Sequence, residues 1–472
     1  MKIFNTMTRQ KEELVPLQPG RIKMYACGPT VYDFFHIGNA RAFITFDMLR
    51  RYLEYRGYVV EFCQNFTDID DKMIARANAE NITVAELAER FIAEYYKDAD
   101  KLHILRPTHQ PRATDTMEEI IALISALEEK GFAYELEDGV YFDILKYPEY
   151  GCLSHMRLDE LKEGASDRDV QTVGKKSPMD FALWKKKKED EPYWASPWGE
   201  GRPGWHIECS AMIKKYLGTT IDIHGGGQDL TFPHHENELA QSTAGNGEPF
   251  VKYWMHNGFI NVNNEKMGKS LGNFFTVRDI TEKYSHDIIR FFIISSHYRM
   301  PVNFSADLLQ ASENGLERIR NSVENLRFTV KKQEADATIA AEQEKTLSTA
   351  ILQAKEAFVS AMEDDLNTAD AVTAVYELVR AANTAASGAV GKRLLTQAAD
   401  TIVELMEVLG VPVDKKDEDA DVIPPEILAL VEKRSDAKAS KNFILADAIR
   451  DEIVAKGYQI KDTPQGAQVT KL

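Results

Sequence analysis

Apolar and polar residues alternate with two different periods near the start of the chain. In IKMYACG (22–28) every second residue is apolar, which predicts a short strand that ends at Pro29. In the segment 40–57 apolar residues recur with a helical period up to Gly57, which predicts a helix. A strand followed directly by a helix predicts an α/β domain, and it places His36–Asn39 at the beginning of that helix.

Further strand and helix patterns follow. They are a strand at 59–62, helices at 71–101 and 116–130, and a hairpin at 131–147. From there to Gly201 the chain is charged and rich in Gly, Pro and Trp without a long period, so we expect an irregular surface excursion. Residues 202–304 return to α/β patterning.

The composition changes at residue 305. From there to about residue 410, Ala, Leu, Glu, Arg and Lys occur at helical spacing with almost no proline, which predicts a bundle of about four helices. After a charged linker, residues 425–439 and 442–456 predict two short helices, followed by a strand, a turn and a strand. The predicted domains are the first half of the α/β domain (1–130), a connective insertion (131–201), the second half (202–304), the helical bundle (305–410) and a small mixed α/β unit (411–472).

Composition narrows the class of protein. Four cysteines in 472 residues form no disulfide framework, which favours a reducing cytosol. The N-terminus has no apolar run of the signal-peptide type, and no stretch is long enough to span a membrane. A net charge of -17 argues against non-specific polyanion binding by bulk charge, although one basic face is compatible with it.

Two short motifs suit nucleotide phosphates. His36, Gly38 and Asn39 stand at a helix N-terminus, where free N–H groups and partial positive charge favour phosphate. EKMGKSLGN (265–273) places two lysines in a loop that can close over a triphosphate, and it is not a Walker A loop. Each motif alone also fits an ordinary loop or a charged surface turn.

A third group of residues suits a metal ion. Cys27 stands at a strand end, Cys209 lies in a predicted helix, and His234 and Glu238 share a helix face at i and i+4. Zinc accepts such sulfur, nitrogen and oxygen ligands. Taken singly, the cysteines fit a core role and the His–Glu pair fits a surface contact. HHENE matches neither HExxH nor HxxEH, so a hydrolytic zinc site is disfavoured.

In combination the motifs resemble the cysteinyl-tRNA synthetase family of class I aminoacyl-tRNA synthetases. HIGN (36–39) corresponds to that family's HIGH signature, and KMGKS (266–270) corresponds to its KMSKS signature. Other segments resemble family landmarks across nearly the whole chain: CGPTVYD, NFTDIDDK, GWHIECSAM, HGGGQDLTFPHHENE, MHNGF and EDDLNTADA. The resemblance implies a Rossmann-type parallel-sheet catalytic domain with an insertion, followed by a helical bundle and a small anticodon-binding unit.

The resemblance also implies a reaction and its participants. Cysteine and ATP give cysteinyl-adenylate and pyrophosphate, and the cysteinyl group then passes to the 3′ end of tRNA(Cys). The implied cofactors are one Zn²⁺ per chain and Mg²⁺ with the ATP substrate. The implied protein is a cytoplasmic monomer that binds tRNA(Cys), L-cysteine and ATP and no membrane.

Site residues follow from the resemblance in four sets. The zinc ligands are Cys27, Cys209, His234 and Glu238. The cysteine-binding residues are Thr67, Trp205, His224 and Asp229, where Asp229 suits either the α-amino group or the ribose. The ATP-binding residues are Thr30, His36, Gly38, Asn39, Gly227, Asp229, Lys266 and Lys269. The catalytic set is His36, Asn39, Lys266 and Lys269, with the two lysines stabilising the adenylation transition state.

A zinc site would solve a specific selection problem. Cysteine differs from serine by sulfur against oxygen, and an apolar pocket separates such similar side chains by only ~1–3 kcal/mol. Zinc binds a thiolate far better than a neutral hydroxyl, so metal coordination reads the one feature that differs. An editing domain would then be unnecessary, and we expect the 131–201 insertion not to be one.

Two departures and three alternatives accompany the resemblance. Asn39 replaces the last His of HIGH, and Gly268 replaces the Ser of KMSKS, while both lysines remain.

Ligases that join cysteine to an amino-sugar share the catalytic half, but the helical region and the last 60 or so residues favour tRNA. A non-catalytic module descended from a synthetase is disfavoured by the intact lysines and ligands, and a zinc hydrolase by the lack of a dedicated base.

The C-terminal helices have two interpretations. They fit a plain amphipathic hairpin, or they bind RNA with phosphate contacts from Arg434, Lys438, Lys441 and Arg450. Cys63 and Cys152 carry no assigned role, and we expect both to fill the core.

Overall fold

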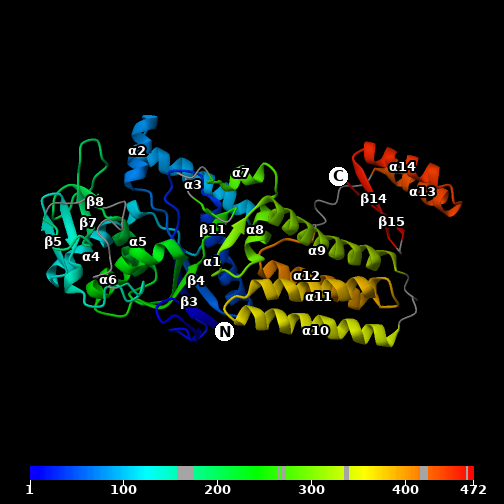
Figure 1. The fold of residues 1–472 in the computed structure, drawn as a ribbon, viewed down its shortest axis with the longest axis horizontal. Helices are drawn as coiled ribbons and strands as arrows, with labels where there is room; N and C mark the ends of the chain where they lie inside the picture. The colour runs from blue at the N-terminus through cyan, green and yellow to red at the C-terminus, as the bar shows by residue number, and fades with distance from the viewer. Residues whose placement is uncertain are drawn as a thin grey trace. The chain divides into compact units, whose positions relative to one another are not determined.

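A parallel sheet of four strands lies in the N-terminal part of the chain in the computed structural model (Figure 1). Its order is β10-β9-β3-β4, with β3 at Arg21–Ala26, β4 at Val59–Gln64, β9 at Ile221–Gly227 and β10 at Val251–Asn257. All three pairings are parallel, with Met24 opposite both Phe62 and Ile223. The predicted Rossmann-type parallel sheet is therefore confirmed.

The structure describes residues 1–156, 174–263, 265–267, 273–333, 340–414, 424–463 and 466–471. It divides into two units. Unit 1 comprises Met1–Glu313, Val359–Ala371 and Val408–Val411. Unit 2 comprises Asn314–Phe358, Val372–Glu407 and Pro412–Leu472. The finer domain boundaries derived from composition stay predictions.

Helix α1 (Ile37–Tyr55) connects β3 to β4 and packs against the sheet. Its periodic apolar residues are the reason for that packing, since Ala40, Ile44 and Leu49 are fully buried. The remaining helices of unit 1 are α2 (Asp71–Glu80), α3 (Val84–Lys101), α4 (Met117–Glu129), α5 (Trp205–Tyr216), α6 (Glu236–Asn246), α7 (Val277–Thr281) and α8 (His286–Ile294). Metal and substrate candidates lie on α5 and α6, which pack against each other.

The connective insertion is more ordered than its composition predicts. The predicted hairpin is present as β5 (Ala133–Leu136) and β6 (Gly139–Phe142). It extends into an antiparallel sheet with β7 (Phe181–Lys186) and β8 (Gly201–Pro203). The expectation of an irregular excursion is wrong here, because β7 begins with a buried apolar run, and a buried strand shows no alternation to detect. Trp184 on this strand is fully buried.

Three short strands carry the second nucleotide motif. β11 (Ile260–Val262) pairs in parallel with β13 (Val302–Phe304) and antiparallel with β12 (Glu265–Lys266). A separate hairpin, β1 (Lys2–Asn5) and β2 (Gln10–Glu13), begins the chain. The KMGKS motif thus starts on β12, at the end of a small sheet.

Unit 2 is largely helical, in agreement with the predicted bundle. Most of its length lies in four long helices, α9 (Ala306–Lys332), α10 (Ala341–Glu363), α11 (Thr368–Ala386) and α12 (Lys392–Val408). Their apolar faces form a core that includes Leu316, Phe358, Val375 and Ile402, each fully buried. No helix in the described ranges is long and apolar enough to cross a lipid bilayer.

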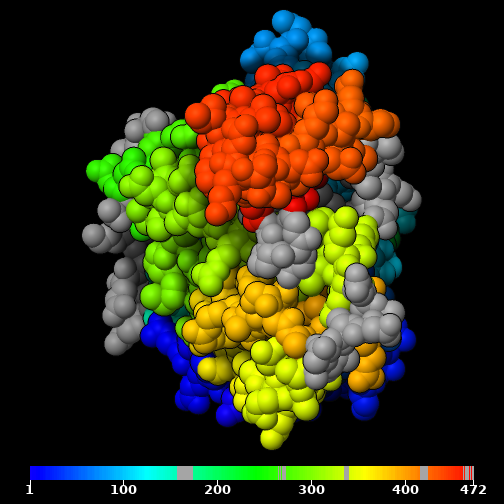
Figure 2. Space-filling model, turned by 90° about the vertical axis from the view of Figure 1, so that its right-hand side faces the viewer, coloured from blue at the N-terminus to red at the C-terminus, as the bar shows by residue number. Residues whose placement is uncertain are grey.

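The last part of the chain forms the predicted pair of helices and pair of strands. These are α13 (Pro425–Ala439), α14 (Phe443–Ala455), β14 (Tyr458–Thr463) and β15 (Gly466–Lys471), and they surround their own apolar cluster. In Figure 2 the two helices form one contiguous orange-to-red surface. The predicted phosphate contact from Arg434 is wrong, because this side chain is buried and donates to both carboxylate oxygens of Asp462 at 2.8 and 3.0 Å.

Candidate active site

Thiol, imidazole and carboxylate groups converge at the carboxyl ends of the parallel strands. Cys27 follows β3, His234 and His235 lie in a turn at Thr231–His235, and Glu238 lies in the first turn of α6. One ligand atom from each of these residues lies within 4.8 Å of the others. This edge of an open α/β sheet is where ligands bind, since the strands end there and the loops diverge.

The four predicted zinc ligands come together. The His234 Nε2 atom lies 2.9 Å from Glu238 Oε1, and the Cys27 Sγ atom lies 3.7 Å from the same oxygen. The Cys209 Sγ atom, from α5, lies 3.6 Å from His234 Nε2. The structure adds His235, whose Nε2 atom lies 3.2 Å from Cys27 Sγ. We call these five residues the thiol–imidazole cluster.

Other imidazoles surround the thiol–imidazole cluster. The His206 Nδ1 atom lies 2.9 Å from His234 Nδ1, and the His256 Nε2 atom lies 2.8 Å from His235 Nδ1. His224 was predicted to contact the substrate cysteine. Here it is fully buried on β9, and its Nε2 atom lies 2.8 Å from Glu238 Oε2. This hydrogen bond orients the Glu238 carboxylate, and the contact of His224 with the substrate stays a prediction.

Without an ion, the groups of the cluster shift one another's pKa in both directions: burial raises the pKa of the Cys27 thiol well above its ordinary value, and, against the effect of burial, Glu238 and Cys209 raise the pKa of His234 to about 9. Burial alone would raise the pKa of the Glu238 carboxyl, but His224 and His234 lower it to about 2. A hydrogen bond from Cys27 lowers the pKa of the Cys209 thiol below its ordinary value. Burial and the neighbouring histidines hold His235 neutral, with a pKa well below its ordinary value. Two thiols, imidazoles and a carboxylate form a donor set that fits zinc.

The HIGN motif forms a capped helix start. His36 is the N-cap of α1: its Nδ1 atom accepts from the Asn39 backbone N–H, and the Asn39 side chain accepts from the His36 N–H, each at 3.3 Å. This reciprocal capping explains how asparagine fits the last position of the motif. A Cβ atom on Gly38 would stand 2.9 Å from the His36 ring, so glycine is required for this arrangement.

The HIGN segment contacts the chain on both sides of the KMGKS loop. A Cβ atom on Gly38 would also stand 3.3 Å from the Met267 side chain. On the far side of the loop, Ile37 N–H donates to Phe275 C=O and Val277 N–H donates to Phe35 C=O, each at 3.2 Å. Lys266 lies on β12, whereas Gly268 and Lys269 lie outside the described residues.

Of the predicted cysteine-binding residues, Trp205 contacts the cluster, whereas Thr67 lies beside the segment at Thr30. Trp205 begins α5 and stacks on His234 with ring centroids 4.1 Å apart. Thr67 is buried, and its backbone pairs with the segment at Thr30, where Val31 N–H donates to Thr67 C=O at 3.1 Å. Its hydroxyl accepts from the Asn65 amide at 3.3 Å.

Gly227 and Asp229 lie at the end of β9. Gly227 is the last residue of that strand, and Asp229 is exposed in the turn that follows. A Cβ atom on Gly227 would stand 2.4 Å from Asp229 Oδ1, so the carboxylate lies directly over the backbone. Both predicted ATP residues therefore lie at the same sheet edge as the cluster.

Comparison with known proteins decides the family. The description "tRNA synthetases class I (C) catalytic domain" matches residues 13–314, and "DALR domain" matches residues 357–414. A "Cysteine--tRNA ligase" from Caldicellulosiruptor saccharolyticus is 56% identical over 472 residues, covering 100% of both chains. The chain belongs to the cysteine–tRNA ligase family. It is thus an ATP-using aminoacyl-tRNA synthetase of class I.

Solved structures of other class I synthetases share the fold. Methionyl-tRNA synthetase from Mycobacterium tuberculosis with methionyl-adenylate aligns with a TM-score of 0.58 and 15% identity, covering 82% of this chain and 89% of that one. A LeuRS–tRNA–LeuAMS ternary complex from Agrobacterium radiobacter K84 aligns with a TM-score of 0.63 and 12% identity, covering 84% and 85%. At these identities the likeness concerns the fold of the ligase and nothing finer.

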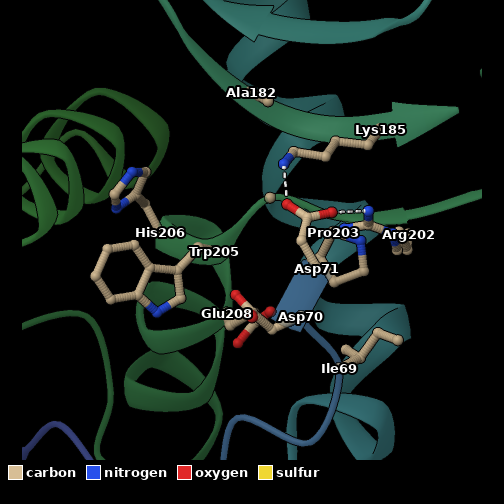
Figure 3. Close-up of a pocket in the computed structure, with 11 residues that line it drawn as sticks. Ile69, Asp70, Asp71, Ala182, Lys185, Arg202, Pro203, Trp205, His206 and Glu208 are labelled. Atoms are coloured by element: carbon tan, nitrogen blue, oxygen red, sulfur yellow. Dashed lines mark hydrogen bonds and ion pairs between the residues drawn. The ribbon is translucent and has the colours of Figure 1, made fainter. Parts of the chain in front are cut away.

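Sequence reasoning missed several residues of this cysteine–tRNA ligase site. The predicted metal ligands include His234 but not its neighbour His235. The i, i+3 spacing of His235 to Glu238 also places these two residues on one helix face. Asn65, whose side chain accepts from the Gly28 N–H at 2.9 Å, had no signal in the sequence. Glu208 was overlooked because it precedes a more conspicuous cysteine. It lines a separate cavity (Figure 3).

Proposed function

We propose that the chain selects cysteine through a zinc ion, activates it with ATP and transfers it to tRNA(Cys). The observation that supports this most is the convergence of Cys27, His234 and Glu238, with Cys209 Sγ 3.6 Å from His234 Nε2, at the carboxyl ends of the parallel strands. A single ion per chain would be held by those four side chains. His235 is the alternative ligand to Cys209, since its Nε2 atom lies 4.0 Å from Glu238 Oε1 and 3.2 Å from Cys27 Sγ.

The surroundings of the four side chains support a metal-binding role. His206 and His224 hydrogen-bond to His234 and Glu238, which fixes the orientation of both groups. The low pKa of Cys209 and Glu238 keeps both groups deprotonated, the state that binds metal. A bound Zn²⁺ would supply a coordination position that takes a thiolate in preference to a hydroxyl and lowers the thiol pKa.

We assign ATP to the start of α1 and its neighbours. His36 and Asn39 offer polar side chains, and Gly38 lets the backbone approach a phosphate at the helix N-terminus. Thr30, Gly227 and Asp229 border the same sheet edge, and Asp229 suits a ribose. Lys266 and Lys269 would neutralise charge that develops on the phosphates during adenylation, with Mg²⁺ expected alongside.

Cysteine would lie between Thr67 and Trp205. Trp205 covers His234, so its indole would exclude water from the thiol position. His224 orients Glu238 in this proposal, and its contact with cysteine stays a prediction.

We assign tRNA recognition to the helical part. Residues 305–410 would support the tRNA stem, and residues 411–472 would contact the anticodon. Lys441 and Arg450 remain proposed phosphate contacts, whereas Lys438 already pairs with Asp462 at 2.8 Å. A monomeric cytoplasmic enzyme fits this arrangement.

The experiment is amino-acid-dependent ATP–pyrophosphate exchange, with cysteine against serine, before and after zinc chelation. We expect exchange with cysteine alone, lost on chelation and restored by zinc. Cys209→Ser should lose both bound zinc and exchange, while the matched variant Cys152→Ser, outside the cluster, should keep both. Cysteine-dependent exchange that persists in fully zinc-free protein would contradict the zinc proposal, and no exchange in any condition would contradict the assignment of cysteine and ATP to this site.

A further inference from the structure

A buried arginine in the first turns of α1 lacks an acidic partner. Arg41 stands two residues after the HIGN motif and is 1% exposed, and no carboxylate of the described residues pairs with it. Burial lowers the pKa of its guanidinium to about 10, so the group stays charged at neutral pH. A buried charge without a counter-charge is costly unless hydrogen bonds compensate it. The groups that accept those hydrogen bonds therefore show what this side chain holds in place.

Backbone carbonyl groups from two segments take the place of a carboxylate. The Arg41 Nη1 atom donates to Phe259 C=O at 2.6 Å. The Nη2 atom lies 3.0 Å from the Tyr298 oxygen and 3.3 Å from the His297 oxygen, and it also donates to Met300 C=O. A planar guanidinium serves several acceptors in fixed directions at once, which a single ammonium group does not. Arg41 thus fixes both segments relative to α1.

Those two segments lead into the strands beside the KMGKS motif. Phe259 immediately precedes β11, and the segment 297–300 ends just before β13, the parallel partner of β11. Helix α1 also packs against β11 (Figure 1). On its other edge β11 pairs with β12, where Asn261 stands opposite Lys266. Only one short strand therefore separates the carbonyl groups bound by Arg41 from the backbone of Lys266.

Close packing leaves little freedom where the two segments meet. A Cβ atom on Gly258 would stand 2.5 Å from the Arg299 carbonyl oxygen and 2.8 Å from the Met300 carbonyl oxygen. The Gly258 N–H donates to Tyr298 C=O at 2.9 Å. Glycine at this position lets the two backbones approach, so that their carbonyl groups can face the same guanidinium.

The chain that follows the KMGKS motif is tied to the same helix start. The backbones of His36 and Thr276 form a bridge, and the hydrogen bonds from Ile37 and Val277 lie on either side of it. The start of α1 thus holds the chain both before and after the motif. Groups that act on one triphosphate need a fixed separation, since a misplacement of about 1 Å can cost about a hundredfold in rate.

We propose that Arg41 is a positioning residue, which sets the distance between the HIGN helix start and Lys266 for adenylation. The proposal rests on the proposed function, because it takes both motifs as parts of the ATP site. Arg41 touches no substrate in this proposal, and it acts through the backbones of β11 and β12.

The test is a double-mutant cycle between Arg41→Lys and Lys266→Ala in the zinc-loaded full chain. Single-turnover formation of cysteinyl-adenylate is followed by the release of pyrophosphate. We expect Arg41→Lys to slow this step about tenfold to hundredfold, with the KM for cysteine and the zinc content unchanged. In the Lys266→Ala background the same substitution should change the rate by less than about threefold, because the group that it positions is absent.

Arg290→Lys is the matched control. Arg290 is also fully buried and also contacts α1, through Asp47, but its other hydrogen bonds go to the carbonyl groups of Leu102, His103 and Leu409. We expect both lysine variants to lower the unfolding temperature by a similar amount. Below that temperature, Arg290→Lys should form the adenylate within about threefold of the wild-type rate.

Three results would overturn the proposal. The first is an unchanged rate in Arg41→Lys, and the second is an equal effect of this substitution with and without Lys266. The third is an equal loss of rate in Arg290→Lys, which would show a merely structural role. If Arg41→Lys fails to fold, Gly258→Ala replaces it in the cycle, because it displaces the same carbonyl groups, and an additive effect with Lys266→Ala is then the overturning result. Failure of the proposed function would appear elsewhere, as Lys266→Ala protein that forms the adenylate at the wild-type rate.

Discussion

Two buried glutamates in neighbouring parts of the site have carboxyl pKa values that are shifted in opposite directions by their neighbours. Glu238 is fully buried and has His224 at 2.8 Å and His234 at 2.9 Å, which hold the pKa of its carboxyl low. Glu208 is buried to the same degree, but burial raises the pKa of its carboxyl, and its neighbours Cys209, Asp68 and Asp70 raise it further. One carboxylate is already compensated by the protein, whereas no cation of the described residues stands beside the other.

The difference shows that the neighbours of a buried carboxyl, and not its burial alone, decide the direction of its pKa shift. A metal site binds its ion tightly when its ligands are already deprotonated and oriented. Ligands that must lose a proton or move on binding lower the metal affinity. A buried carboxyl without such partners destabilises the folded chain instead. The same substitution, Glu to Gln, at the two positions should therefore change the unfolding free energy in opposite directions.

The largest effect is expected from Glu238→Gln. The variant keeps the side-chain shape but leaves His234 without its anionic partner, so metal-free protein should lose about 3 kcal/mol of unfolding free energy. Zinc affinity should fall more than about hundredfold, beyond the loss typical of an orienting residue. Urea unfolding followed by tryptophan fluorescence measures the first value, because Trp254 stacks on His224 and Trp205 on His234. Competition with a chelator measures the second. Wild-type zinc affinity in this variant would remove Glu238 from the ligand set.

His235→Gln tests whether the cluster has a fifth ligand. If His235 only supports the cluster, zinc affinity should fall by about tenfold to hundredfold. A fall as large as that of Glu238→Gln would instead make His235 a direct ligand. His256→Gln is the matched control, since it removes the hydrogen bond to His235 Nδ1 and leaves the Cys27 contact in place. The same chelator competition measures both variants.

Whether a feature could be predicted from the sequence depends on how far apart its residues lie along the chain. The start of α1 was predictable because alternation, helical period and the HIGN motif lie within one short stretch. The spacing of His234 and Glu238 also placed them on one helix face. The sequence carried no signal for the cavity beside Glu208, because its walls come from α2, from α5 and from the insertion sheet. Long-range burial and pairing of charges arise only when the fold is formed.

A reversed effect on stability is expected at the second glutamate. Glu208→Gln removes a buried carboxyl that has no cationic partner in the part of the chain that the structure describes, so metal-free protein should gain up to about 1 kcal/mol of unfolding free energy. The same urea titration measures it, beside Glu238→Gln. A loss as large as at Glu238 would show that Glu208 is already compensated in the folded chain, and the comparison between the two glutamates would then fail.

The smallest effect is expected at the ion pair of the C-terminal helices. Arg434 and Lys438 lower the pKa of the Asp462 carboxyl, whose side chain is 48% exposed. A carboxyl whose pKa is depressed in the folded state stabilises fully above its unfolded pKa of about 3.9, and this contribution is lost as the pH falls through the lower folded value.

Because solvent screens this pair, Asp462→Asn should cost about 0.5–1 kcal/mol of local unfolding free energy at pH 7. Hydrogen exchange of α13 measures that energy, and the difference from wild type should shrink as the pH falls below about 4. Asp451→Asn, an exposed carboxylate on α14, serves as the control. A difference that is independent of pH would mean that packing around Arg434, and not the charge of Asp462, stabilises the α13 segment.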